Sequence, residues 1–429
     1  MVSTTVHQLS TNRFPTVSLR AASVNSLAMI VLVADKLETS ATEGLRALGV
    51  DLVERPATTA EELPDALRET GADLLIVRST RVTAEALAAG RLGAVVRAGA
   101  GTDTIDVEAA SQNGVLVANT PGRNAQAVAE LAFGLILACD RRIPDGVIAL
   151  REGRWDKREF SKAKGLAGRT LGLVGMGKIG QEMATRAKAF GMHVVALSRW
   201  LTPEVAAALG IGRAENLDEL AQLSDVVSVH VALNPETRAM MNAAFFAALP
   251  EGAIVINTSR AEVMDQSALL DAVRTRGIRA GLDVFEGEPA APVAPYDGEL
   301  RDAPGVYATH HIGASTEQAQ ESVASEVVRV VREYVLTGKV PNVVNVRRAE
   351  AASHLLVVRH LDRVGVLAHV LGVLKDEGVN VQEMENIVLG GAKSAIAQIA
   401  VDGAPSPAAL LRVKKNENVF DAVVMPLAR

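Results

Sequence analysis

From Met29 onward, short apolar runs alternate with segments whose apolar positions recur every three or four residues. This alternation is typical of parallel β-strands joined by crossover helices. Several of the runs contain few polar residues, as expected for strands that are buried on both faces. The pattern predicts a first, smaller α/β unit with strands at Ile30–Val33, Leu74–Val77, Ala94–Arg97 and Val115–Ala118.

A helical segment from Asn124 to Arg141 leads to a second α/β unit. A further helix, from about Glu317 to Leu336, is expected to return the chain to the first unit. The second unit is predicted to contain six strands, at Leu171–Val174, His193–Leu197, Val226–Val231, Ala253–Asn257, Ile278–Asp283 and Val306–Thr309.

A glycine-rich loop follows the first of these six strands directly. After it, Ile179, Met183, Ala187 and Phe190 recur at helical spacing. A flexible turn is the plain alternative, but the order strand, Gly-x-Gly-x-x-Gly, helix favours a dinucleotide site. In such a loop the glycines let the backbone approach a pyrophosphate, whose charge meets the helix N-terminus. The candidate cofactor residues here are Gly175, Gly177, Lys178, Ile179 and Gly180.

A third unit begins near Ser353 and has a different pattern. One helical face, Val366 to Leu374, lies between strand-like segments, and a short helix precedes the last strand. The predicted order is βαββαβ, an α+β unit. Its strands are expected at Leu355–Val358, Val381–Leu389, Ser394–Val401 and Val419–Met425.

Composition narrows the class of protein. The 429 residues exceed what one hydrophobic core usually serves, and aromatic residues make up 3%. The net charge of −6 argues against nucleic acid and anionic membranes as partners. The longest apolar stretch, Val128 to Cys139, is interrupted by Glu130 and is too short for a membrane span. The chain has a single cysteine, Cys139, which lies in an apolar helical pattern and is expected to be buried in a core. A lone cysteine cannot form an internal disulfide, so we expect a reducing compartment and a cytoplasmic location.

Residues 1–28 differ from the rest of the chain. They are rich in Ser and Thr, and the first acidic residue is Asp35. Such a composition resembles an organellar transit peptide. A disordered tail, or a true start at Met29, explains the same composition.

Three residues after predicted strands carry the chemistry. Arg260 can hold a carboxylate through two parallel hydrogen bonds, and His311 can move a proton. Glu288 can raise the pKa of the imidazole. Taken singly, such an arginine is more often a surface residue, and the histidine a satisfied core residue. His310 and Glu286 are neighbours that compete for the same roles.

The segments around these residues resemble the D-isomer-specific 2-hydroxyacid dehydrogenases. His311, in His-Ile-Gly, matches the catalytic histidine of that family, and Glu288, before Pro289, matches its catalytic glutamate. The resemblance also implies that Asp283 lies on the nicotinamide side of the cofactor, with Thr258 and Ser259 in the cofactor site. It implies a Rossmann-type doubly wound cofactor domain and a flavodoxin-like substrate domain formed from both ends of the catalytic chain. The expected domains are 1–28 (extension), 29–126 and 315–346 (substrate), 127–314 (cofactor) and 353–429.

Two substrate-domain loops resemble those of family members that act on phosphoglycerate. The resemblance implies oxidation of 3-phospho-D-glycerate to 3-phosphohydroxypyruvate, the first step of L-serine biosynthesis. An NADPH-dependent glyoxylate or hydroxypyruvate reductase is the alternative enzyme, and a non-catalytic NAD(H)-sensing scaffold is the alternative of another class. The candidate substrate residues are Arg78 and Ser79 for the phosphate, with Ala100, Gly101 and Asn119.

The cofactor itself has two candidates. An acidic residue that binds the ribose hydroxyls of NAD is expected about twenty residues past the glycine loop. Ser198 and Arg199 stand there instead. We expect NAD as the cofactor, with NADP as the alternative because Arg199 can accept a 2′-phosphate.

The third unit resembles an ACT domain, with a generic ferredoxin-like dimerisation domain as the alternative. His360, Asp362 and Asn380 match the positions that hold serine in regulated relatives, so L-serine is a candidate effector. Asp362 stands where those relatives have asparagine. The resemblance further implies a homodimer or homotetramer. No metal site is expected, because the histidines lack ligand-like spacing.

Overall fold

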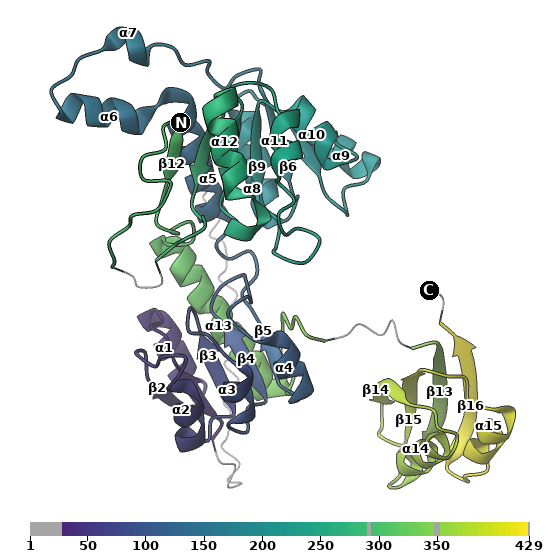
Figure 1. The fold of residues 1–429 in the computed structure, drawn as a ribbon. Coiled ribbons are helices and arrows are strands. Elements are labelled where there is room, and N and C mark those ends of the chain that lie inside the picture. The colour runs from purple at the N-terminus through teal and green to yellow at the C-terminus, as the bar shows by residue number, and fades with distance from the viewer. Residues whose placement is uncertain (1–27, 290–292, 347–351, 428–429) are drawn as a thin grey trace, which may run out of the picture. The chain divides into compact units, whose positions relative to one another are not determined.

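The computed structural model describes residues 28–289, 293–346 and 352–427. The extension predicted at the N-terminus therefore lies almost wholly outside the described residues. Contacts divide the chain into two compact units, the first ending at Asn342 and the second beginning at Val343 (Figure 1).

The first sheet of unit 1 has five parallel strands in the order β2-β1-β3-β4-β5. This is the flavodoxin-like order, as predicted. The structure adds β2, which the sequence pattern did not reveal. The strands are β1 (Ile30–Val33), β2 (Asp51–Glu54), β3 (Leu74–Val77), β4 (Ala94–Arg97) and β5 (Leu116–Ala118).

Helices cover both faces of this sheet. Helices α2 (Leu63–Thr70), α3 (Ala84–Ala88) and α4 (Val107–Gln112) bury one face. Helix α1 (Thr39–Arg46) and the late helix α13 (Glu317–Thr337) pack together over the other face. Helix α13 thus completes a core that begins almost three hundred residues earlier in the chain.

The second sheet has seven parallel strands in the order β12-β11-β10-β9-β6-β7-β8. Strand order reverses between β6 and β9, and ligands of doubly wound folds bind at this point. The strands are β6 (Thr170–Val174), β7 (His193–Leu197), β8 (Gly212–Arg213), β9 (Val226–Val229), β10 (Ile254–Asn257), β11 (Arg279–Leu282) and β12 (Val306–Ala308). Six match the predicted strands, whereas the two-residue β8 was missed.

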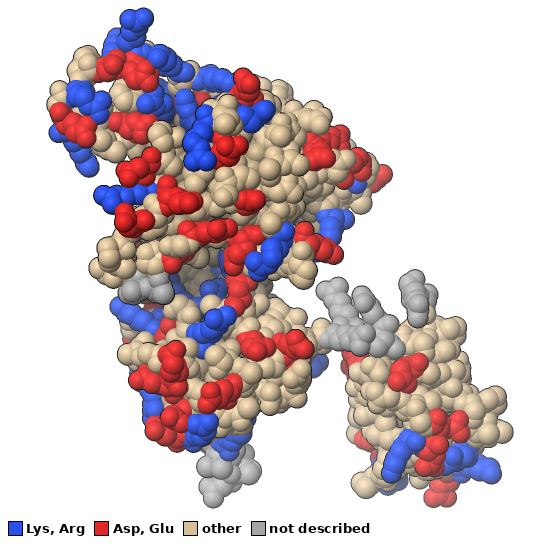
Figure 2. All heavy atoms as spheres, in the orientation of Figure 1, with Lys and Arg blue, Asp and Glu red and all other residues tan. Residues whose placement is uncertain are grey.

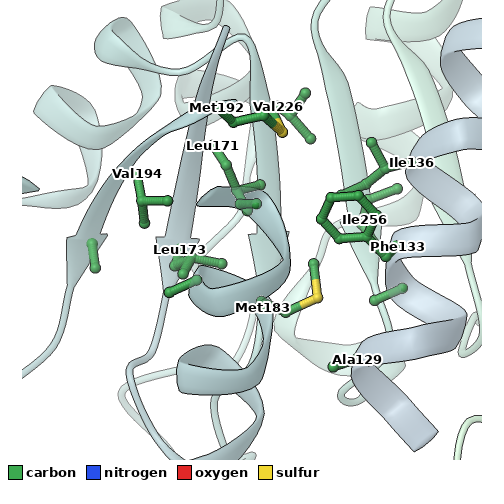
Figure 3. Packing of buried hydrophobic residues seen from close by; sticks show 14 of the residues in the cluster. Ala129, Phe133, Ile136, Leu171, Leu173, Met183, Met192, Val194, Val226 and Ile256 are labelled. Carbon is green, nitrogen blue, oxygen red and sulfur yellow. The ribbon is translucent and has the colours of Figure 1, made fainter. Parts of the chain in front are cut away.

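The cores of this sheet lie on its two faces. Helices α5 (Ala125–Arg141) and α8 (Lys178–Ala189) cover one face, where Phe133 and Ile136 point from α5 into the cluster of buried side chains (Figure 3). Cys139 belongs to this cluster, which confirms the prediction that it is buried. Helices α10 (Leu217–Leu223), α11 (Ala243–Ala248) and α12 (Gln266–Arg276) cover the other face. The remaining helices of the unit are α6 (Ile143–Arg151), α7 (Lys157–Phe160), α9 (Pro203–Leu209) and the short η1 (Ala261–Val263).

Unit 2 is a four-stranded antiparallel sheet with two helices. Its strand order is β14-β15-β13-β16. The element order confirms the predicted βαββαβ pattern. The elements are β13 (His354–Leu361), α14 (Val366–Asp376), β14 (Val381–Val388), β15 (Ser394–Val401), α15 (Pro407–Lys414) and β16 (Val419–Pro426).

Charges of both signs lie interspersed over the face shown in Figure 2. This distribution agrees with the small net charge of −6. Across the part of the chain that the structure describes, no helix is both long enough and apolar enough to cross a membrane.

Candidate active site

The three predicted catalytic residues follow three adjacent parallel strands. Arg260 comes after β10, Glu288 after β11 and His311 after β12. Because the carboxyl ends of parallel strands share one edge of a sheet, the three side chains belong to the same edge. The structure joins His311 Nδ1 to Glu288 Oε2 at 2.8 Å. The competing neighbours His310 and Glu286 make no such contact with each other.

The backbone of His311 is held in an unusual conformation. Its φ of 54° lies in the left-handed region, which non-glycine residues seldom adopt. Asp283, only 2% exposed, holds the loop in place. Its carboxylate accepts hydrogen bonds from the Ile312 and Gly313 amides at 2.8 and 2.7 Å, and from the Thr309 hydroxyl at 2.7 Å. Asp283 therefore positions the loop of His311, while its predicted contact with the cofactor stays a prediction.

The His311–Glu288 contact changes the pKa of both partners. The hydrogen bond to Glu288 raises the pKa of His311 above its usual value, against the opposing effect of burial. Burial alone would raise the pKa of Glu288, but the hydrogen bonds from His311 and from the Phe285 amide together hold that pKa below its usual value. Glu288 is thus ionised and accepts the proton of Nδ1, which leaves Nε2 of His311 for a substrate hydroxyl or carbonyl oxygen.

Arg260 is held on several sides. Its Nε lies 2.6 Å from Asp103 Oδ2, and its Nη1 donates to the Ser259 carbonyl at 2.7 Å. The buried Asn257 braces the turn, since its Nδ2 donates to the Arg260 carbonyl and its Oδ1 accepts from the Ser259 amide and hydroxyl. Sequence reasoning singled out neither Asn257 nor Asp103. A local sequence pattern does not show that these two side chains would meet Arg260 or its loop.

The glycine loop has the geometry that a pyrophosphate needs. Gly175 has a φ of 99°, and a Cβ there would stand 2.6 Å from the His230 carbonyl oxygen. A Cβ on Gly180 would stand 2.3 Å from the Gly175 carbonyl oxygen, whereas one on Gly177 would meet open space. Helix α8 begins at Lys178 with no side-chain cap, so its first N–H groups are available to an anion.

Buried polar atoms near this loop also fit a dinucleotide. Within the described residues, the Thr258 hydroxyl and His230 Nδ1 are buried without a hydrogen-bond partner. His230 follows β9, which lies next to β6 and its glycine loop, and Thr258 follows β10, the next strand in the sheet. Burial lowers the pKa of His230 to about 3, so its ring is neutral and Nδ1 can exchange a hydrogen bond with an uncharged polar group. The residues present therefore fit a nicotinamide dinucleotide.

The end of β7, where the adenosine ribose is expected, carries no acidic side chain. Ser198 is half-buried, and Arg199 is 91% exposed, with Nη1 3.9 Å from the Glu236 carboxylate. Arg199 is thus free to reorient towards a ligand, since an exposed pair at this distance is worth little.

The predicted substrate residues lie on the loops after β3, β4 and β5. The Ser79 hydroxyl donates to Asp35, whose carboxylate also accepts from the amides of Arg78, Ser79 and Thr80. Asn119 Nδ2 donates to the Ala100 carbonyl at 2.5 Å. The Ser79 and Asn119 side chains are therefore used in holding loops, although each retains further hydrogen-bonding capacity.

A cavity of about 100 Å³ adjoins these loops, and its charged lining consists of Lys36, Arg78 and Arg97 with one acidic residue, Glu38. Arg78 was predicted as a phosphate ligand, whereas Lys36 and Arg97 were not singled out. Burial and the nearby Arg260 lower the pKa of Arg97 from its usual value, which reflects the density of cations here. Three cations around a small cavity are suited to an anionic group.

The three predicted effector residues of unit 2 have different environments. His360 is 1% exposed, and its ring nitrogens meet the Leu361 carbonyl at 2.7 Å and Asn386 Oδ1 at 3.1 Å. Asp362 and Asn380 are exposed. In the described part of unit 2, no hydrogen bond joins the three side chains. Their role as an effector site stays a prediction.

Among the described residues, no three His, Cys, Asp or Glu side chains gather as metal ligands would.

Residues 133–313 match the family model of the D-isomer specific 2-hydroxyacid dehydrogenase NAD binding domain. The hydroxypyruvate reductase of Thermotoga maritima is 44% identical over 262 residues, which cover 60% of this chain and 83% of that protein. The chain belongs to the D-isomer specific 2-hydroxyacid dehydrogenase family, and its cofactor domain is of the NAD-binding type.

Within the family, the D-3-phosphoglycerate dehydrogenase of Mycobacterium tuberculosis is 41% identical over 356 residues, or 81% of this chain and 64% of that protein. The matched part of the chain covers between 58% and 64% of the length of the D-3-phosphoglycerate dehydrogenases to which it is similar. A solved structure with a similar fold is the NADPH-dependent glyoxylate/hydroxypyruvate reductase of Sinorhizobium meliloti in complex with NADP and malonate. It has a TM-score of 0.64 and 29% identity, and the similarity covers 74% of this chain and 96% of that one.

Proposed function

We propose that this protein oxidises 3-phospho-D-glycerate to 3-phosphohydroxypyruvate with NAD or NADP, the reaction that opens L-serine biosynthesis. The observation that carries the proposal is the 2.8 Å contact between His311 and Glu288, with Arg260 on the neighbouring loop. The similarity to phosphoglycerate dehydrogenases supports the choice of substrate. The intact Arg, Glu and His argue against a non-catalytic NAD(H)-sensing scaffold.

In the proposed reaction, Nε2 of His311 removes the proton of the substrate hydroxyl while the C2–H bond breaks. Bound NAD(P) supplies the hydride acceptor. The imidazolium that results is stabilised by Glu288, whose carboxylate already faces Nδ1. Arg260 binds the substrate carboxylate and thereby orients C2. In the reverse direction His311 returns the proton to the carbonyl oxygen.

The phosphate of the substrate is assigned to the cationic cavity. Arg78, Arg97 and Lys36 line it, and Arg97 Nε is anchored by the Arg78 carbonyl at 3.1 Å. Anchoring through Nε leaves the terminal nitrogens of Arg97 for phosphate oxygens. This arrangement distinguishes a phosphorylated substrate from hydroxypyruvate or glyoxylate, which have no phosphate to bind there.

A substrate panel tests this function. Absorbance of the reduced cofactor is followed with 3-phosphoglycerate, hydroxypyruvate and glyoxylate, for the natural protein and for Arg78→Ala. We expect the variant to lose about 10- to 100-fold in kcat/KM for 3-phosphoglycerate, the value of a charge-assisted hydrogen bond, and little for glyoxylate. An equal loss for both substrates would remove the phosphate from this cavity. No turnover of 3-phosphoglycerate by the natural protein would refute the function itself.

A glyoxylate or hydroxypyruvate reductase that uses NADPH is the second candidate. Ser198 and the exposed Arg199 favour it, because a neutral side chain beside an arginine accommodates a 2′-phosphate. We expect NADP to be used at least comparably to NAD, and Ser198→Asp to shift the preference towards NAD by repelling that phosphate. Ser161→Asp, which adds the same charge after α7, serves as the control. If the natural protein does not use NADP, the hypothesis that Arg199 binds a 2′-phosphate is wrong, and Arg199 is only a solvent-exposed charge.

For assembly, we propose a homodimer that forms through α6 and the following loop. Ile143, Ile148, Leu150 and Trp155 are exposed there, and exposed apolar side chains in one segment are typical of an interface. A tetramer would need a second contact, for which unit 2 is the candidate. Light scattering after gel filtration gives the number of copies. Leu150→Glu is expected to shift the protein towards monomer, and an unchanged mass would exclude α6 as the interface.

L-serine is the proposed effector of unit 2, based on His360, Asp362 and Asn380. Inhibition requires serine to bind a less active state more tightly, by about 1–3 kcal/mol for typical coupling. Titration of serine against the initial rate tests this. A rate that stays constant up to millimolar serine, and that does not change after deletion from Ser353 onward, would leave unit 2 as an assembly domain.

A further inference from the structure

Arg260 and Asp103 form an ion pair across 157 positions of sequence. Both Nε and Nη2 of the guanidinium lie 2.6 Å from the same oxygen, Asp103 Oδ2. Asp103 lies in the loop after β4, a strand of the first sheet, whereas Arg260 lies in the loop after β10, a strand of the second sheet. The contact therefore joins a loop of the expected substrate domain to the residue that would bind the substrate carboxylate.

The donors of Arg260 can be counted. A guanidinium has five N–H groups: one on Nε and two on each terminal nitrogen. Asp103 accepts a hydrogen bond from Nε and lies 2.6 Å from Nη2 as an ion-pair partner, and the Ser259 carbonyl accepts a hydrogen bond from Nη1. With one N–H of Nη2 on the side of Asp103, one N–H on Nη1 and one on Nη2 remain. These neighbouring groups form the end of the guanidinium, a fork that suits a second carboxylate.

The loop beneath the guanidinium is shaped for this contact. A Cβ on Gly101 would stand 2.0 Å from Arg260 Nη2 and 3.0 Å from Asp103 Oδ2. Only a residue without a side chain permits that approach, and the φ of Gly101 is not in the left-handed region, so the need is for space. Gly99 is in the same situation beneath Arg97, since a Cβ there would stand 2.0 Å from Arg97 Nη1.

Asp103 also moderates the charge around the site. Arg78, Arg97 and Arg260 are close enough to interact, and the positive charge of Arg260 is one of the causes that lower the pKa of Arg97. Asp103 acts in the opposite direction on the same group. Without it, Arg260 would lose its direct ion-pair partner and would still be repelled by Arg97.

We propose that Asp103 is a positioning residue for Arg260: it binds the Nε–Nη2 edge of the guanidinium, and so presents the Nη1–Nη2 end to the substrate carboxylate. Gly101 provides the space that this placement requires. The inference rests on the proposed function, because it specifies how Arg260 would bind the 2-hydroxy acid. It also explains why the carboxylate of Asp103 need not compete with that of the substrate.

Steady-state kinetics of the full-length protein tests the proposal with hydroxypyruvate and reduced cofactor. We expect Asp103→Asn and Asp103→Ala to lower kcat/KM by about 10- to 100-fold, mainly through a higher KM, with the alanine variant more affected because asparagine keeps an acceptor. Binding of the reduced cofactor, measured by fluorescence, should stay unchanged. Glu108→Gln is the matched control, since it removes an exposed carboxylate of nearby α4 without touching Arg260.

A KM that stays the same in both Asp103 variants, or one that falls, would overturn the proposal; a lower KM would mean that Asp103 competes with substrate. Gly101→Ala is a second variant that keeps Asp103 and displaces the guanidinium, and it should raise KM in the same way. If the natural protein turns over no 2-oxo acid, the proposed function fails, and a crystal structure of Asp103→Ala decides the positioning role alone. Arg260 still lying over Gly101 in that crystal would refute it.

Discussion

The contact between His311 and Glu288 decides which ring nitrogen is available for chemistry. An ionised carboxylate can only accept, so Nδ1 of His311 carries the proton and donates it to Oε2. Nε2 is then the proton acceptor when the ring is neutral. The left-handed φ of 54° at His311 would be costly in a free loop, and the three hydrogen bonds to Asp283 stabilise it.

We predict that the pH dependence of 2-hydroxy acid oxidation follows His311. Its pKa is raised above the usual 6.5, so kcat/KM should rise with pH to an inflection above that value. Glu288→Gln should move the inflection to lower pH, because the neutral amide no longer favours the imidazolium, and should reduce the maximal rate by about 100-fold. Rates measured between pH 5 and 10 give both quantities.

Glu286→Gln is the control for that experiment. Glu286 is two residues away and exposed, so its loss should leave the inflection in place. An inflection that does not move in Glu288→Gln would show that the hydrogen bond has no influence on the titrating group.

Among the elements, α13 is held to the first unit by a buried carboxylate. Glu326 is 4% exposed and accepts hydrogen bonds from Arg329 and Asn342 at 2.6 and 2.7 Å, and from Arg123. These bonds, with that from Arg329 the strongest, lower the pKa of Glu326 from 4.5 to about 2. One helix residue thus connects α13 to the segment before α5 and to the end of unit 1.

We predict that Glu326 contributes to acid sensitivity. A folded-state pKa below the unfolded value gives stability that is complete above about pH 4.5 and is lost as pH falls towards 2. The difference corresponds to about 3 kcal/mol of unfolding free energy, of which about 2 kcal/mol is lost by pH 3. Urea unfolding gives the unfolding free energy at pH 7 and at pH 3. The decrease between the two pH values should be smaller by about 2 kcal/mol in Glu326→Gln than in the natural protein. Glu321→Gln, an exposed carboxylate on the same helix, should behave like the natural protein.

The elements that sequence could predict are those whose pattern is local. β3 is apolar throughout and β10 is apolar except for its last residue, Asn257, because helices cover both faces of each strand, and their positions were predicted within a residue. β2 was missed because this edge strand begins and ends with exposed Asp51 and Glu54, so it has no apolar run. β8 was missed because two residues, Gly212 and Arg213, are too few to form a pattern.

On the scale of the whole molecule, the site combines segments that are distant in sequence. Arg260, Glu288 and His311 could be predicted as catalytic residues because each lies in a short motif. Asp103 was not predicted at all, and Asp283 was predicted beside the cofactor but not as the residue that holds the His311 loop, since these contacts join positions 157 and 30 residues apart that no local pattern records. The cavity that Lys36, Arg78 and Arg97 line likewise combines loops from distant parts of the chain with α13. Such contacts depend on the folded arrangement of the strands.

We predict that Cys139 reports on unfolding of unit 1. Its side chain is fully buried in the cluster beneath α5 and α8, and burial raises the pKa of the thiol above its usual value. A thiol reagent such as DTNB should therefore react at least about 10³-fold more slowly with the folded protein than with the protein in denaturant, as expected for a group exposed only by opening of the core. A fast reaction under native conditions would show that α5 opens locally. Cys139→Ala provides the blank.

The return of α13 to the first sheet has a consequence for how the chain folds as it leaves the ribosome. The valines of α13 complete the face formed by Val31, Val33 and Leu45, so that face stays uncovered until Glu317–Thr337 has been synthesised. At about 5–20 residues per second, this interval lasts tens of seconds. The second sheet, whose strands are contiguous from Thr170 to Ala308, can collapse within it. The cofactor domain is therefore expected to fold first on the nascent chain. Until α13 has been synthesised, the exposed aliphatic surface of β1 and α1 is expected to need protection by chaperones.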